Sequence, residues 1–335
     1  MREIHHISLC TLPTPLMEMP QLSAKLEGPR ILIKRDDLTG LAMGGNKGRA
    51  LEFLMAEAKD MGADVVVAVG PQQSNWLCNL TAAARKVGMD VILFLLKGTD
   101  EVQGNLLLDK FLGAEIKLTG MERRDISAVN KQMDNLAAEL RSQGRKPYIL
   151  RYGTIAPLGM VGYVYLASEI CQQLQEKQLA AQYLFLANGS GCTHAGLVLG
   201  AKYYQAPFKV VGIMLDPTNS RDGQARIISD EANKTARFLE MDFTSKSDEI
   251  TCHDEYAGSF IPTKKSIEAS RLVAETEGFF VDPIYTGKVM EALIDQIRDG
   301  KIKREDTVIL YHSGGLPAMF VYSKELSASN SPRGV

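Results

Sequence analysis

The chain lacks the sequence features of several protein classes. Among its 335 residues no apolar run approaches the roughly 20 residues of a transmembrane helix, and a typical long run is VILFLL at 91–96. The first ten residues, MREIHHISLC, have no apolar core and no small-residue cleavage site, so we expect no secretion signal. Dense basic runs are missing too, and a net charge of -2 gives no reason to expect nucleic acid binding. These absences favour a cytoplasmic protein with neither a membrane nor a nucleic acid partner.

Cysteine is scarce and scattered. The five cysteines are Cys10, Cys78, Cys171, Cys192 and Cys252. An odd set without any C-x-x-C pair is typical of reduced thiols in a cytosolic protein, not of a disulfide framework or a zinc site. His5 and His6 are adjacent, so their side chains would point apart on a helix or a strand, and we expect no metal site there.

What the chain does have is the composition of an ordinary globular protein. Hydrophobic residues make up 45% and charged residues 23%, and the length suggests about two domains. Apolar runs such as ADVVVAVG at 63–70 and QYLFLANG at 182–189 alternate with helix-like segments. Because these runs lack polar alternation, we expect parallel sheets covered by helices on both faces, an α/β fold. The polar stretch 219–255 is expected to form a helix and a surface loop.

Three glycine-rich turns follow strand-like runs, at the edge where α/β sheets bind ligands. The first, NGSGCTHAG at 188–196, would point its amides at an anion beside the start of the next helix, so we predict a phosphate site. One alternative is a dinucleotide fingerprint, because Gly189 and Gly191 form half of G-x-G-x-x-G and Asp216 stands where a ribose-binding acid would lie. The third glycine position holds His194, which weakens that match. The other alternative is a tight structural turn.

The other two turns carry weaker signals. GPQQSNWLCN at 70–79 places Ser74 and Asn75 at the start of a predicted helix, where they could donate hydrogen bonds to a carboxylate. Either residue could instead serve only as the helix N-cap, and the residues alone leave both readings open. YHSGGLPA at 311–318 delivers Ser313 to the end of a strand, where a single serine is usually structural.

The segment LAMGGNKGRALEF at 41–53 places Lys47 on a glycine hinge at the start of an amphipathic helix. The helix dipole, the nearby Arg49 and burial would each disfavour the ammonium form and lower the pKa of this lysine. A lowered pKa suits an amine nucleophile that forms a Schiff base. Lys47 is therefore the best candidate for a catalytic lysine in the chain.

Several motifs in a fixed order resemble one enzyme family. IKRDDLTGLAMGGNKGRALEF is similar to the lysine segment of fold-type II pyridoxal-phosphate (PLP) enzymes, and more narrowly of the D-cysteine desulfhydrase and 1-aminocyclopropane-1-carboxylate (ACC) deaminase family. LPTPL, QSN, GSGCTHAG, VDPIYTGK and HSGGLPA extend the resemblance over nearly the whole chain. It implies a tryptophan synthase β-like fold of two three-layer α/β domains, a larger one in residues 1–49 and 163–335 and a smaller inserted one in residues 50–162. It also implies a homodimer.

The resemblance implies which residues hold the cofactor, pyridoxal 5'-phosphate. Lys47 would bind it covalently and, once released by the substrate, would shuttle a proton. Asn46 would bond the phenolic oxygen of the cofactor, and Ser313 would lie at the pyridine nitrogen. The phosphate would be held by Gly189, Ser190, Gly191, Cys192 and Thr193.

The resemblance also implies a set of residues that face a small amino-acid substrate. Ser74 and Asn75 would lie against the substrate, with Asn75 binding its carboxylate. Tyr285 would lie beside the reacting carbons, and Tyr256 would be a second phenol of the site. Trp76 replaces a polar residue of the family and would add an aromatic wall to the pocket.

Small residues beside the lysine also depart from the family. Gly48 and Ala50 stand where larger residues are usual.

Two positions favour β-elimination over ring opening. In ACC deaminases the position of Thr286 is a glutamate aimed at the pyridine nitrogen, and the position of Ser313 is leucine-like, whereas the desulfhydrases carry a hydroxyl residue there. A hydroxyl supplies no negative charge to stabilise a pyridinium, so the electron sink is weaker. That sink suffices when a good leaving group departs from Cβ, but opening a cyclopropane is harder.

We therefore predict a PLP-dependent lyase that converts a small β-substituted amino acid, as D-cysteine desulfhydrase does, to pyruvate, ammonia and sulfide. The alternatives are an ACC deaminase, a cysteate-type lyase, a nicotinamide-dependent oxidoreductase, and a protein that binds PLP without turnover.

Overall fold

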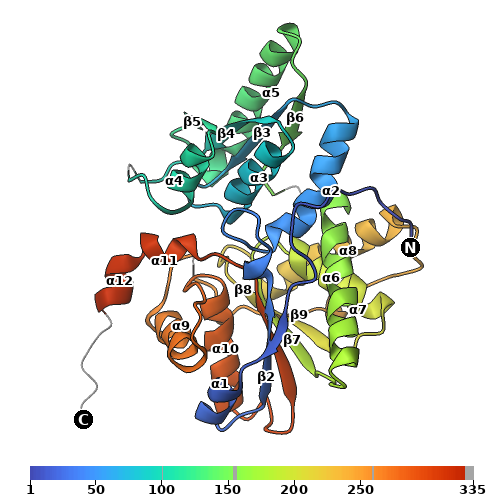
Figure 1. The fold of residues 1–335 in the computed structure, drawn as a ribbon, viewed down its shortest axis with the longest axis vertical. Coiled ribbons are helices and arrows are strands. Elements are labelled where there is room, and N and C mark those ends of the chain that lie inside the picture. The colour runs from blue at the N-terminus through green and yellow to red at the C-terminus, as the bar shows by residue number, and fades with distance from the viewer. Residues whose placement is uncertain (100, 154–156, 259, 329–335) are drawn as a thin grey trace.

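A computed structural model describes residues 1–99, 101–153, 157–258 and 260–328 (Figure 1). Two separate β-sheets lie at opposite ends of an elongated molecule, and the helix α2 (Lys47–Asp60) extends from one toward the other (Figure 1). Among the helices of the described ranges, none combines the length and the apolarity needed to cross a membrane.

The larger sheet has six strands in the order β1-β2-β10-β7-β8-β9. These strands are β1 (Leu16–Glu18), β2 (Arg30–Arg35), β10 (Thr307–His312), β7 (Tyr183–Asn188), β8 (Lys209–Met214) and β9 (Thr251–His253). Neighbouring strands run parallel except β1, which is antiparallel to β2. Their carboxyl ends therefore meet at one edge, where the glycine turns after β7 and β10 lie together.

Helices cover both faces of the larger sheet. One face packs on α1 (Pro20–Lys25), α9 (Lys264–Glu277) and α10 (Thr286–Arg298), and the other on α6 (Pro157–Glu176) and α7 (Cys192–Tyr203). Successive residues of β10 alternate between these faces: Val308 and Leu310 join the first cluster, and Ile309 and Tyr311 join the second. A strand buried on both sides needs apolar residues at every position, which is why the run TVILY shows no polar alternation.

The smaller sheet has four parallel strands in the order β5-β4-β3-β6. These strands are β3 (Val65–Gly70), β4 (Asp90–Leu95), β5 (Glu115–Leu118) and β6 (Pro147–Leu150). The helices α3 (Asn75–Lys86), α4 (Gly104–Phe111) and α5 (Ile126–Ser142) pack around this sheet (Figure 1). Two α/β units with mostly parallel sheets confirm the predicted fold class. The predicted domain boundaries, after residues 49 and 162, fall within α2 and α6 and stay a prediction.

The stretch 219–255 differs in part from its predicted structure. Its first half forms the expected helix, α8 (Arg221–Phe238). The second half contains a 3-10 turn, η3 (Ser247–Glu249), and then β9, which pairs with β8 as the edge strand of the larger sheet. The expected surface loop is therefore partly a strand, because three residues of edge pairing leave no hydrophobic run for a sequence pattern to reveal.

Candidate active site

Lys47 begins α2 as the sequence predicts, and it does so on a closely packed pair of glycine turns. Gly44 and Gly45 have φ of 75° and 120°, conformations that favour glycine. The amide of the N-cap residue Asn46 donates to the carbonyl of Ser313 (3.0 Å). A Cβ on Gly314 would lie only 2.6 Å from the Cα of Gly45. The turn after β10 and the hinge before α2 thus meet backbone to backbone, which only glycine allows.

Lys47 as a whole residue is partly exposed, but burial of its amine lowers its pKa, while Cys192 acts in the opposite direction. Arg49 was expected to lower the pKa further. This part of the prediction is wrong, because the Arg49 guanidinium is paired with Asp36 (2.7 and 2.9 Å) and with Glu169 (2.9 Å). Its charge is compensated there and has little effect on Lys47. The predicted lowering itself is confirmed.

The pair of Arg49 with Asp36 belongs to a buried ionic network that holds α2 on the larger sheet. Asp36 is fully buried and also accepts hydrogen bonds from Thr14 (2.7 Å) and Tyr311 (2.5 Å). Burial alone would raise the pKa of Asp36, but the Arg49 charge and these hydrogen bonds hold it below its usual range. Glu169 of α6, the second carboxylate partner of Arg49, also accepts a hydrogen bond from Lys34 of β2. The network fixes the hinge that carries Lys47.

The turn between β7 and α7 has the features expected of an anion cradle. Its N-cap residue Gly191 has φ of 90°, and within the described ranges no acceptor faces the amides of Ser190, Thr193 and His194. Free amides at a helix N-terminus, together with the helix dipole, fit a phosphate group. The Thr193 hydroxyl accepts a hydrogen bond from Asn46 Nδ2 (3.1 Å), so the cradle and the Lys47 hinge are in direct contact.

The same geometry does not fit a dinucleotide. His194, at the third glycine position, is fully buried, and burial lowers its pKa to about 3. A Cβ on Gly212 of β8 would lie 2.4 Å from its ring, so the imidazole fills the space between helix and sheet. Asp216, the expected ribose ligand, is bound by Arg123 (2.5 Å) and by Thr218 (2.6 Å). The carboxylate that a ribose would need is therefore occupied.

Asp282 and His312 organise the carboxyl end of β10. Asp282 is fully buried and accepts hydrogen bonds from the amides of Ile284 (2.9 Å), Tyr285 (2.6 Å) and Thr286 (3.0 Å), which start α10. Its oxygens are therefore engaged by the backbone. Both oxygens of this buried carboxylate thus face the start of α10.

The Thr286 hydroxyl is occupied by His312. The Nδ1 atom of His312 accepts the Gly314 amide (3.3 Å), and its Nε2 lies 3.0 Å from the carbonyl of Phe280. The proton is thus on Nε2, and Thr286 must donate to Nδ1 (3.2 Å). Ser313 is partly exposed, and among the described residues no partner is recorded for its hydroxyl. Ser313 is therefore a hydroxyl that the end of β10 can offer to a ligand.

The start of α3 holds the predicted substrate residues. Ser74 is the N-cap residue and accepts the Leu77 amide (3.2 Å), so its capping role is observed. Asn75 follows and is partly exposed. Trp76 packs its partly buried ring against the apolar core, and no contact recorded in the described ranges makes it a pocket wall. The sequence analysis did not predict a role for Asn79, which lies one turn after Asn75. Its side chain donates to the carbonyl of Gly44 (3.4 Å), so α3 contacts the Lys47 hinge.

The two predicted tyrosines occupy different surroundings. Tyr285 is partly exposed, its pKa is raised by burial, and its ring lies 6.3 Å from that of Phe260. The sequence analysis did not predict a role for Phe260. Its ring would lie 3.6 Å from a Cβ built on Gly189, so it links Tyr285 to the phosphate cradle. Tyr256 packs against the apolar cluster under α9 and α10. Burial, with Asp295 nearby, raises its pKa to about 12, and no recorded contact of the described chain joins it to Lys47.

Cys10 accounts for the small residue at position 48. A Cβ on Gly48 would lie 2.2 Å from Cys10 Sγ, so the thiol fills the space that a larger residue would use. Burial and, to a smaller extent, the Glu52 charge raise the pKa of this thiol to about 12. The thiol therefore stays protonated and fills space in the packing around α2. Ala50, the other small residue, is fully buried in α2.

We expect Gly48→Ala to lower the free energy of unfolding by about 1–3 kcal/mol through overpacking. Urea denaturation measures the loss. The free energy of unfolding of the double variant Cys10→Ala/Gly48→Ala should fall by much less than the sum of the two single losses, because the sulfur that the added methyl group would meet is absent. If Gly48→Ala lowers the free energy of unfolding equally with and without the Cys10→Ala substitution, this account of the packing is wrong.

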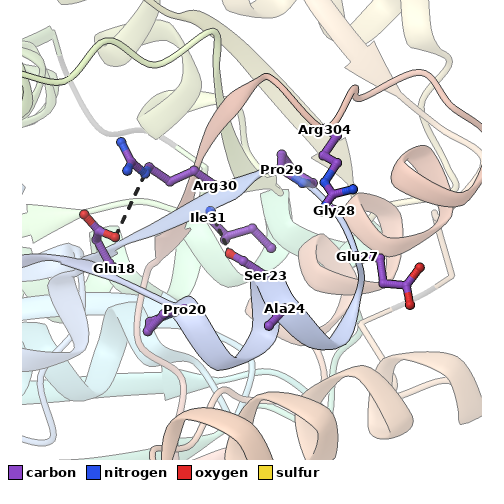
Figure 2. A pocket seen from close by; sticks show the side chains of 10 residues that line it. All are labelled: Glu18, Pro20, Ser23, Ala24, Glu27, Gly28, Pro29, Arg30, Ile31 and Arg304. Carbon is purple, nitrogen blue, oxygen red and sulfur yellow. Dashed lines mark hydrogen bonds and ion pairs between the residues drawn. The ribbon is translucent and has the colours of Figure 1, made fainter.

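An open cavity of about 440 Å³ lies apart from these residues (Figure 2). Arg30, at the start of β2, and Arg304, shortly before β10, contribute to its lining, which places it at the amino ends of these strands. Its charges include the exposed pair of Arg30 and Glu18 (4.0 Å). Lys47 and the phosphate cradle lie at the opposite edge of the sheet, so this cavity does not belong to the candidate active site.

A sequence model of the family described as pyridoxal-phosphate dependent enzyme matches residues 7–314, and the chain belongs to this family. Within it, relatives carry two names. A D-cysteine desulfhydrase of Klebsiella pneumoniae is 37% identical over 96% of the chain and 97% of its own length. Putative ACC deaminases of Pyrococcus abyssi and Pyrococcus furiosus are each 34% identical, over 96% of the chain and 94% of their own lengths. A solved structure described as an ACC deaminase homologue matches with a TM-score of 0.86 and 33% identity, over 97% of this chain and 96% of that one.

The family establishes pyridoxal phosphate as the cofactor, and the described residues fit it. Lys47 supplies an amine with a lowered pKa, and the turn before α7 supplies amides for a phosphate. The nicotinamide alternative is thereby overturned, in agreement with the occupied Asp216 carboxylate.

Proposed function

We propose that the protein catalyses a deaminating α,β-elimination on a small β-substituted amino acid, with D-cysteine as the substrate and pyruvate, ammonia and sulfide as products. The observation that carries the proposal is the set of groups at the end of β10. Ser313 offers a hydroxyl, Thr286 is turned to His312, and the Asp282 oxygens are engaged by amides. Without a carboxylate at the pyridine nitrogen the electron sink is weak, which suits a substrate whose thiolate leaves readily.

We assign the following roles to the side chains. Bound pyridoxal phosphate supplies the electron sink that makes the Cα proton removable. The Lys47 amine takes that proton, since burial favours its neutral form. Asn75 donates to the substrate carboxylate, with Ser74 beside it. Tyr285 stays protonated because burial raises its pKa, so its hydroxyl can donate to the departing sulfur.

We assign the remaining predicted residues to the cofactor and the pocket. Asn46 would bond the phenolic oxygen of the cofactor, and Ser313 would lie at its pyridine nitrogen. Trp76 and Tyr256 pack against two apolar clusters, and their predicted place beside the substrate stays a prediction. The phosphate would be held by Gly189, Ser190, Gly191, Cys192 and Thr193.

ACC deamination is the second candidate, because two relatives and one solved homologue carry that name. A cysteate-type lyase shares the elimination chemistry and differs only in the leaving group.

We expect purified holoenzyme to release pyruvate and sulfide from D-cysteine faster than keto acid from L-cysteine, β-chloroalanine, cysteate or ACC. The assay measures keto acid with each compound, and sulfide with the two cysteines. Release of 2-oxobutyrate from ACC as the fastest reaction would replace the proposal with ACC deamination. A yellow protein that turns over none of these compounds would contradict both candidates and favour a binding role.

We further propose a cytoplasmic homodimer. Light scattering coupled to gel filtration should give twice the chain mass of 36.8 kDa. A mass equal to one chain would contradict the dimer.

A further inference from the structure

The carboxamides of Asn75 and Asn105 touch at the start of α3. Asn105 is the second residue of α4 and is buried. Its Nδ2 donates to the backbone carbonyl of Gln73 (3.0 Å) and to Oδ1 of Asn75 (2.7 Å). One buried amide thus holds both the turn before α3 and the side chain proposed to bind the substrate.

The hydrogen-bond partners determine which end of each amide faces which neighbour. A backbone carbonyl can only accept, so the Asn105 atom that faces the Gln73 carbonyl must be the nitrogen. The same nitrogen faces Asn75, which therefore must present its oxygen. The Gln73 side chain holds Asn105 in turn: its Oε1 accepts a hydrogen bond from the backbone N–H of Asn105 (2.9 Å), and its Nε2 donates to the backbone carbonyl of Gln103 (3.0 Å).

A glycine makes room for this arrangement. Gly104 has φ of 56°, and a Cβ there would lie 2.3 Å from Gln73 Oε1. Any other residue at this position would push the Gln73 amide away from Asn105. The turn before α4 is therefore shaped around the amide pair.

With its oxygen held by Asn105, Asn75 has only N–H donors left for a ligand. No partner for its Nδ2 is recorded in the described part of the chain, and the side chain is partly exposed. Asn75 and Asn79 are four residues apart and so share one face of α3. Since Asn79 donates to Gly44 in the hinge before Lys47, that face is turned toward the catalytic lysine.

We propose that Asn105 is a positioning residue, which holds the Asn75 amide with its nitrogen toward the substrate and so selects amines that carry a carboxylate. A carboxylate can only accept hydrogen bonds, so a flipped Asn75 would repel it. The inference rests on the proposed function, in which Asn75 binds the substrate carboxylate. It adds that a residue of α4, outside contact with the substrate, sets this preference.

The test compares two amines that differ by one carboxylate. Alanine, in the enantiomer that binds better, and ethylamine are titrated into holoenzyme while the visible spectrum of the bound cofactor is followed. Asn105→Asp turns the donor into an acceptor and forces Asn75 to flip, and Asn105→Ala removes the donor. Gln103→Glu is the matched control, because it introduces a carboxylate two residues away, where only the backbone carbonyl contacts Gln73 and the side chain bonds the exposed Glu101.

We expect Asn105→Asp to weaken alanine binding roughly tenfold or more and Asn105→Ala by a smaller factor, as for a hydrogen bond to a charged group. Ethylamine binding should change less than about twofold, and the control should match the wild type with both amines. Unchanged alanine binding in both Asn105 variants, or an equal loss for both amines, would overturn the positioning role. A wild-type spectrum that does not respond to alanine would instead overturn the proposed function, and the inference with it.

Discussion

Replacing Lys47 with alanine is expected to abolish covalent attachment of the cofactor and to lower keto acid release by about 10³-fold or more, as for loss of a catalytic base. The expectation follows from the position of the amine, on a glycine hinge between the phosphate cradle and the Ser313 turn. Borohydride reduction followed by peptide mapping measures the attachment, and wild-type protein should carry its pyridoxyl group on the peptide that contains Lys47.

Lys59→Ala is the matched control for this experiment, since Lys59 is an exposed lysine in the last turn of the same helix. Its reduced peptide map and its turnover should equal those of the wild type. A pyridoxyl group on Lys34 or Lys288, whose side chains are fully buried, would show that the assignment of Lys47 is wrong.

Asp36→Asn is expected to lower the free energy of unfolding by about 3–5 kcal/mol at neutral pH, because it leaves the buried Arg49 charge without its main partner. The pKa of Asp36 is held below its usual range in the folded state. Its contribution is therefore fully present above the unfolded pKa, about 4, and is lost as the pH falls through the lower folded value. Urea denaturation of both proteins at pH 7 and at pH values below 4 measures the difference, which should shrink on acidification.

Asp60→Asn is the control for that comparison. Asp60 lies at the exposed end of α2, where it pairs with His5. An exposed pair contributes about 0–1 kcal/mol, so this variant should stay close to the wild type. If Asp36→Asn and Asp60→Asn lower the free energy of unfolding by the same amount, the buried network does not anchor α2 in the way described.

The sequence predicted those features that depend on neighbouring residues. The run TVILY indicated a strand buried on both faces, and the turn at 188–196 indicated an anion site, because glycines, amides and a helix start lie within a few positions. The start of α2 at Lys47 could be predicted for the same reason.

Features that depend on distant residues could not be predicted in this way. In β2 the charged Lys34 is fully buried and bonds Glu169 of α6, far along the chain. The same separation explains why Arg49 does not act on Lys47: its carboxylate partners lie on other elements. The contacts of Phe260, which has φ of 49°, and of the Asn105 side-chain amide also depend on how separate turns pack together. They could not be predicted from the neighbouring sequence.

The order of strands in the larger sheet has a consequence for how the chain is made. β10 lies between β2 and β7, so the strand synthesised last occupies the middle of the sheet. The smaller sheet, whose strands lie within 65–150, can be completed while the ribosome is still at work. The hinge before Lys47 cannot be completed at that stage, because its contacts with Ser313 and Gly314 require residues that are synthesised later. A chain that ends before residue 307 would carry Lys47 without β10 and without the Ser313 turn that contacts its hinge.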